Sequence, residues 1–143
     1  MKFLIALAFG ALMINGCTSA DQQAKVSGAK DSTTIQWIDS IDQNIGKINQ
    51  GEVVEILWHF KNTGNKPLIV EKVTPGCGCT GADGPKEPIA PGKEGVITAK
   101  FDSKNFQGTQ HKSVTVKANY TNHTSGGFQD VLAFNVEVVP AKK

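Results

Sequence analysis

The sequence predicts an all-β domain, built as an antiparallel β-sandwich of about seven strands. Three observations support this fold class. From about residue 34 onward, apolar residues alternate with polar ones, which is the period of a strand with one buried face. Glycine, proline and asparagine interrupt this alternation, as they do in turns between short strands. No segment after the first 16 residues has a sustained period of 3.6 residues, so we expect no helix there.

The first elements expected lie between residues 34 and 62. Residues 34–38 form a candidate first strand, and Ile45 and Ile48 flank a Gly-Lys pair before a turn at 50–52. The stretch VVEILWHFKN, residues 53–62, alternates most clearly and predicts a strand with one buried face. Its inward residues are expected to be Val54, Ile56, Trp58 and Phe60.

Turn residues at 62–65 separate this strand from the next one. Pro67 suits the start of a strand and leads into LIVEKV at 68–73, which ends at the cysteine-containing turn 74–80. Residues 81–95 contain three prolines and four glycines, so we expect a connector without a strand of its own.

Three further strands are expected at 96–102, 111–120 and 131–139, with a turn at Gly108 and a loop at 121–130. Their aligned apolar residues are Ile97, Ala99, Phe101, Val114, Val116, Ala118, Leu132, Phe134, Val136 and Val138. This number of short strands in roughly 110 residues is typical of an immunoglobulin-like sandwich. The large residues expected to fill its core are Trp37, Trp58, Phe60, Phe101 and Phe134.

The segment ahead of this domain predicts export and a lipid anchor. Lys2 is followed by an apolar run at 4–14, which suits a signal peptide but is shorter than the roughly 20 residues of a membrane-spanning helix. The run ends in INGC at 14–17, which resembles a bacterial lipobox, where the signal is cut before the cysteine and acyl chains are attached to it. The alternative is an ordinary secretory signal cut near Ala20, which would remove Cys17.

This interpretation divides the chain into a signal peptide (1–16), a lipidated Cys17 with a flexible polar linker (17–33) and the sandwich domain (34–143). Several acyl chains on one cysteine hold a protein firmly at a membrane. We therefore expect a lipid-anchored protein of the bacterial cell envelope, at the outer membrane and on its periplasmic or surface side.

The charge pattern argues against nucleic-acid binding. The formal net charge is +2, all 15 basic residues are lysines, and they are scattered rather than clustered. Arginine is preferred where phosphate is held by two hydrogen bonds, and a basic patch is the usual footprint of a nucleic-acid partner. The only membrane contact expected is the lipid, and we expect no cofactor.

Cys77 and Cys79 are separated by Gly78 alone. An even pair of cysteines in an exported protein usually predicts a disulfide. Bridged cysteines need Cα atoms within about 4.4–6.8 Å, and an extended chain places residues two apart at about 6.6–7.2 Å, so the chain must turn here. Closing so small a loop adds only about 1.6 kcal/mol to stability. We favour a local structural turn or disulfide.

Three functional alternatives for this pair remain open. The thiols could form a redox couple, could bind Cu(I) or Zn(II), or could lie in a partner contact. The histidines His59, His111 and His123 are scattered and have no ligand spacing to the cysteines, so no metal site is expected beyond the two thiols themselves.

No catalytic group emerges from the sequence. Asp39 and Asp42 flank Ser40, but we expect no histidine beside them to complete a nucleophilic triad. The Pro-x-x-Pro spacings at 85–88 and 88–91 match polyproline ligands, but a plain connector between strands is the more economical interpretation.

Four motifs resemble a known family: IGKI at 45–48, FKNTG at 60–64, CGCT at 77–80 and IAPG at 89–92. In this order they resemble the bacterial family called domain of unknown function 1573, over about residues 41–139. The resemblance implies an immunoglobulin-like fold, of the kind found in cilia-associated and sperm-protein-like sandwiches, and an envelope location. It implies no established activity.

The sequence thus predicts a lipid-anchored envelope module that is not an enzyme and acts by binding or scaffolding an unidentified protein partner. Exposed strand edges are the surfaces to which partners commonly add a strand. The alternative is a thiol-redox or copper-handling protein that uses Cys77 and Cys79.

Overall fold

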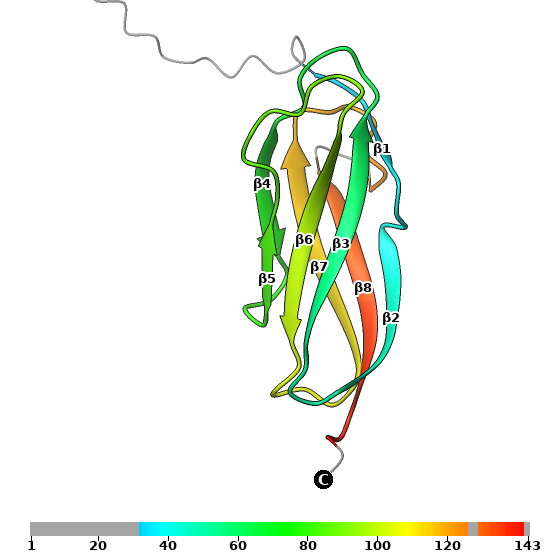
Figure 1. Ribbon diagram of the computed structural model, residues 1–143, viewed down its shortest axis with the longest axis vertical. Helices are drawn as coiled ribbons and strands as arrows, with labels where there is room; N and C mark the ends of the chain where they lie inside the picture. The colour runs from blue at the N-terminus through cyan, green and yellow to red at the C-terminus, as the bar shows by residue number, and fades with distance from the viewer. Residues whose placement is uncertain (1–31, 126–128, 142–143) are drawn as a thin grey trace, which may run out of the picture.

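A computed structural model of the chain describes residues 32–125 and 129–141. The predicted signal peptide, the lipidated Cys17 and most of the linker lie outside these described residues. Two four-stranded sheets face each other across one core, and no helix occurs in the described ranges (Figure 1). The strands are β1 (Ile35–Trp37), β2 (Asp42–Asn49), β3 (Val53–Asn62), β4 (Val70–Pro75), β5 (Thr80–Asp83), β6 (Glu94–Asp102), β7 (Gly108–Ala118) and β8 (Asp130–Val139).

The sheet orders are β1-β3-β6-β5 and β2-β8-β7-β4, so that β4 and β5 form the two edges on one side of the sandwich (Figure 1). The core between the sheets is the one that the alternation predicts. Trp58, Phe101 and Phe134 are fully buried, and Phe60 is 2% exposed. Trp37 is an exception, since it is only half-buried and meets Phe60 edge-on with ring centroids 5.4 Å apart.

One pair of strands is parallel, unlike the antiparallel sandwich expected from the sequence. β2 pairs in parallel with β8 from Asp42↔Ala133 to Asn49↔Val139. The reason is that the chain changes sheets between β1 and β2. β1 pairs with β3 in one sheet, and after Ile38 the chain crosses to the other sheet without reversing direction.

β5 was not predicted as a strand, since Thr80 lies in the predicted turn 74–80 and residues 81–83 lie in the predicted connector 81–95. Its four residues, TGAD, carry no apolar alternation, and it forms because Thr80–Asp83 pairs with β6 at Phe101–Thr98. β2 was also not predicted as a strand, since only Ile45 and Ile48 of its eight residues are apolar. Both are edge strands with few apolar residues, so the alternation that marks the other strands is missing from them.

A buried carboxylate closes the end of the sandwich where β7 leads into β8. Asp130 is 0% exposed and accepts hydrogen bonds from Trp37 Nε1 (3.0 Å) and Tyr120 Oη (2.6 Å), and from the backbone N–H groups of Thr124 (2.6 Å) and Ser125 (3.2 Å). Burial alone would raise the pKa of Asp130, but these donors outweigh it and hold the pKa below its usual value. Burial and the neighbouring carboxylate together raise the pKa of Tyr120.

We predict that Asp130→Asn lowers the free energy of unfolding by at least about 2 kcal/mol, because the new amide N–H₂ cannot accept the bonds that the carboxylate accepts. The folded-state pKa lies below the ordinary value of 3.8, so the ionised carboxylate stabilises the fold above that pH and loses its contribution as pH falls. Urea unfolding between pH 2 and 7 should therefore show a weaker acid dependence in the variant. Equal acid dependence in both proteins would contradict this role.

Candidate functional site

The cysteine turn joins the two sheets. Cys77 and Cys79 are disulfide-bonded, with Cα atoms 5.4 Å apart, in the turn that connects β4 to β5. Gly76 N–H donates to the Ser113 carbonyl (2.8 Å), and Asp102 N–H donates to that of Cys79 (3.4 Å), so each side of the turn is tied to a different sheet. The disulfide therefore lies where the chain passes from one sheet to the other.

A histidine does lie beside Asp39, which corrects the sequence expectation. His59 Nδ1 is 2.7 Å from Asp39 Oδ2, and the His59 backbone N–H donates to the same oxygen at 2.7 Å. These two hydrogen bonds, the backbone one first, lower the pKa of Asp39. The contact forms because antiparallel pairing of β1 and β3 brings together residues 20 apart in sequence. Ser40 Oγ donates instead to the Asp42 carbonyl at 2.7 Å.

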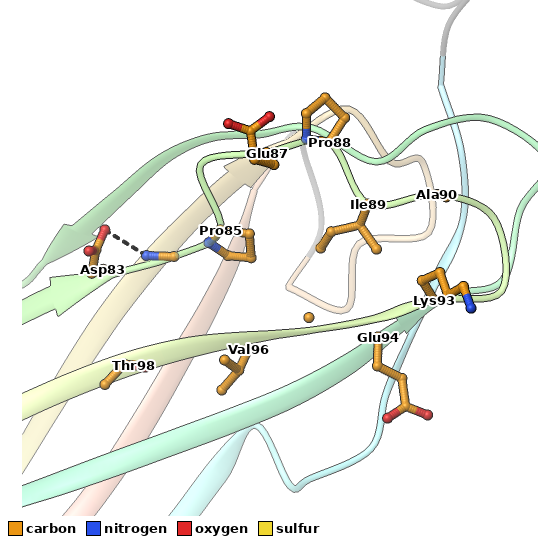
Figure 2. Close-up of a pocket in the computed structure, with 12 residues that line it drawn as sticks. Asp83, Pro85, Glu87, Pro88, Ile89, Ala90, Lys93, Glu94, Val96 and Thr98 are labelled. Atoms are coloured by element: carbon orange, nitrogen blue, oxygen red, sulfur yellow. Dashed lines mark hydrogen bonds between the residues drawn. The ribbon is translucent and has the colours of Figure 1, made fainter.

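A groove of about 650 Å³ lies between the connector 83–90 and β6 (Figure 2). One wall is the connector, which arches away from the sheet, and the other is the outer face of β6 with Val96 and Thr98. Pro85 and Ile89 project into the space from the connector (Figure 2). The sequence pattern predicted a plain connector here, and nothing in it predicted a groove.

The C-terminal end of the connector is held by Ile89. Its backbone exchanges two hydrogen bonds of 2.8 Å with Leu68, and Asn62 Nδ2 donates to its carbonyl oxygen at 2.9 Å. Its side chain is 8% exposed and lies over Gly95, where an added Cβ would be 2.4 Å from Ile89 Cδ1 and 2.7 Å from Phe60 Cζ. Gly95 therefore leaves the space into which Ile89 packs.

At the N-terminal end of the connector, Gly84 lets the backbone lie close to the core. A Cβ at this position would lie 2.9 Å from Ile97 Cδ1 and 3.0 Å from Val73 Cγ2, so the backbone runs close over the core. Between the two ends, Pro85 and Pro88 have no N–H to donate, so the connector cannot pair fully with β6. The groove is thus the space left by a segment fixed at both ends.

The rim of the groove carries charge. Asp83 pairs with Lys86 at 2.5 Å and accepts from the Gly84 N–H at 2.9 Å, and these contacts lower the pKa of Asp83. Glu87 on the connector and Glu94 on β6 are exposed and make no ion pair within the described residues. Each wall therefore carries one free carboxylate, and both point away from the space between the walls (Figure 2).

Within residues 32–125 and 129–141, no three side chains of histidine, cysteine, aspartate or glutamate gather as metal ligands. Over the same ranges, no helix has the length and apolar character that a membrane crossing requires.

Comparison with known proteins supports the expected family. The model of the family "Protein of unknown function (DUF1573)" matches residues 35–126. The chain belongs to this DUF1573 family. The match begins at β1, earlier than the sequence motifs suggested, and stops before β8. It includes the cysteine turn and both walls of the groove. No curated protein matches the sequence.

The most informative solved structures share the fold. A protein of unknown function from Porphyromonas gingivalis W83 is 16% identical, with a TM-score of 0.62 over 80% of this chain and 51% of that one. The ASH/PapD-like domain 7 of human CEP192 is 11% identical, with a TM-score of 0.55 over 87% of this chain and 99% of that one. The secreted serine protease VesC from Vibrio cholerae is 9% identical (TM-score 0.53), over 78% of this chain and 24% of the protease.

At these identities the likeness shows the fold alone. The chain spans about half of the Porphyromonas protein and about a quarter of the protease. The match to the CEP192 domain covers nearly that whole domain, and it confirms the immunoglobulin-like sandwich expected for this DUF1573 member.

We predict that Gly95→Ala destabilises the protein by about 2 kcal/mol, because its Cβ overlaps Ile89 and Phe60 and forces the connector outward. Thermal unfolding followed by circular dichroism measures the change. Gly81→Ala in β5 is the matched control, since a Cβ there meets no atom within 4 Å. A loss of stability as large in the control as in Gly95→Ala would contradict the close packing of Ile89.

Proposed function

We propose that this protein is a non-enzymatic binding module, held at a membrane of the bacterial envelope by acyl chains on Cys17, and that it binds a partner protein in the groove between residues 83–90 and β6. The main observation that supports this proposal is the groove itself. Its walls are fixed by Ile89 and Gly84, it is open to solvent, and it combines an apolar lining with charged rims. Ligand sites are typically preformed hollows of this kind, and a volume of about 300–1,000 Å³ is usual for them.

The place of the groove suits a tethered module. Thr33, the first paired residue, donates through Oγ1 to Asn62 Oδ1 at 2.7 Å, and Asn62 in turn holds Ile89. Thr33 therefore lies at the same end of the sandwich as the connector between β5 and β6 (Figure 1). With a linker of about 20–25 Å, the module would reach partners close to the membrane surface.

The alternative function, thiol-redox or copper handling, rests on the half-buried turn that carries Cys77 and Cys79. A bonded pair has no free thiolate for copper, so copper binding requires prior reduction, whereas redox exchange would begin with attack of a partner's thiolate on the disulfide. Thiol titration with and without reductant, together with elemental analysis of the purified protein, separates it from the binding module.

A photocrosslinking experiment in intact cells tests the proposed function. A diazirine residue replaces Thr98, which lines the groove on β6, in the full chain. We expect a discrete crosslinked product in the membrane pellet, and Cys17→Ser should move both the chain and this product to the soluble fraction.

The matched control places the same diazirine residue at Thr115 of β7, on the opposite sheet. Both threonines are half-buried and lie at mid-strand. Crosslinked products of equal pattern and yield from both positions, or none from Thr98, would contradict a partner site in the groove. A membrane pellet that retains Cys17→Ser would contradict the lipid anchor.

A further inference from the structure

One stretch of β6 has a neighbouring strand on only one side. β6 pairs with β3 over nine residues, from Glu94↔Lys61 to Asp102↔Val53. On its other side it pairs with β5 only from Thr98 to Phe101. Residues 94–97 therefore form an open sheet edge, and this edge lies along the groove (Figure 2).

The hydrogen-bond pattern shows which backbone groups face the groove. Asn62 N–H donates to the Lys93 carbonyl at 2.9 Å on the β3 side, whereas Asp102 N–H donates to the Cys79 carbonyl on the β5 side. Successive residues of a strand point their N–H and C=O groups to opposite sides. Glu94 and Val96 therefore present their N–H and C=O groups to the groove, where no described residue pairs with them.

The connector leaves this edge open because it is fixed elsewhere. Ile89 uses its N–H and C=O for Leu68, and Pro85 and Pro88 have no N–H. Unpaired strand edges accept an extended chain readily, and proteins usually cover or block them. Here the edge is neither blocked by a proline of its own nor covered by a strand.

The charges beside the edge select among extended chains. Glu87 on the connector and Glu94 on β6 have no ion-pair partner in the described ranges, and their carboxylates point away from each other on the outer sides of the two walls (Figure 2), while Asp83 is already paired with Lys86. Lys93 lies at the far end of the groove (Figure 2). An extended chain whose cationic side chains reach either of these two rims would be matched in charge, whereas an acidic chain would be repelled.

We propose that an extended segment of a partner protein, carrying lysine or arginine, adds to β6 as a further strand by pairing with Glu94 and Val96. Its cationic side chains reach Glu87 and Glu94 at the two rims, and its apolar ones contact Pro85 and Ile89. This inference rests on the proposed function and specifies its binding mode. Main-chain bonds supply affinity in such complexes, and side-chain contacts supply selectivity.

The test uses the isotope-labelled full chain in detergent micelles and a capped seven-residue peptide in which lysine alternates with valine. We expect saturable shifts of the Glu94 and Val96 amide signals in nuclear magnetic resonance spectra. The double variant Glu87→Lys, Glu94→Lys should weaken binding at least tenfold, and it should bind a glutamate–valine peptide better than the unaltered chain does. The control variant is Glu55→Lys with Glu71→Lys, whose exposed glutamates lie outside the groove.

Backbone pairing is tested separately. Val96→Pro removes the N–H that faces the groove and leaves the β3 ladder intact, so binding should be lost. If this variant does not fold, a peptide N-methylated at alternate residues makes the same test from the ligand side. Binding of the N-methylated or a proline-interrupted peptide as tight as that of the parent peptide would overturn strand addition.

Three further outcomes would also overturn the proposal. They are absence of shifts at Glu94 and Val96, contacts of the chain's own residues 17–31 with the groove before peptide is added, and shifts that grow with protein concentration alone. The last two would assign the edge to the linker or to a second copy. If the partner crosslinks to Thr98 but the peptide does not bind, strand addition is contradicted and the proposed function stands. If neither the crosslink nor peptide binding is observed, both proposals are contradicted.

Discussion

The contact of Ile89 with Gly95 and Phe60 is the constraint on which the groove depends. A side chain on residue 95 would meet Ile89 within 2.4 Å, so only glycine lets the connector come this close to β6. Once Ile89 is buried and paired with Leu68, the segment before it must arch outward to reach β5. That arch separates the connector from the strand edge and leaves Glu94 and Val96 with unpaired backbone groups.

The core and the open edge are therefore two consequences of the same packing. Trp58, Phe101 and Phe134 bring the sheets together, and Ile89 extends this apolar layer to the end of the sandwich. The Cys77–Cys79 bond contributes little by comparison. Closing so small a loop lowers the conformational entropy of the unfolded chain only slightly, which stabilises the fold by about 1.6 kcal/mol. The apolar core carries the stability, and the disulfide closes the turn that leads into β5.

Sequence patterns predicted the strands whose pairing buries one face, as the alternation of Ile56, Trp58 and Phe60 illustrates. They did not predict β2 or β5, because edge strands with few apolar residues are defined by their partners. The site was less predictable still. The prolines of the connector were visible, but the groove depends on Ile89 packing over Gly95. The Asp39–His59 contact and the donors around Asp130 likewise require strands that meet only in the folded chain.

Amide hydrogen exchange of the free protein tests the open edge most directly. Val96 and Ile97 are neighbours and share the same local opening, so the difference between them reports only whether the N–H is bonded. Because Ile97 pairs with Trp58 of β3, we expect the amides of Glu94 and Val96 to exchange at least about tenfold faster than that of Ile97. Exchange of Val96 as slow as that of Ile97 would mean that the edge is already covered, and would contradict the account.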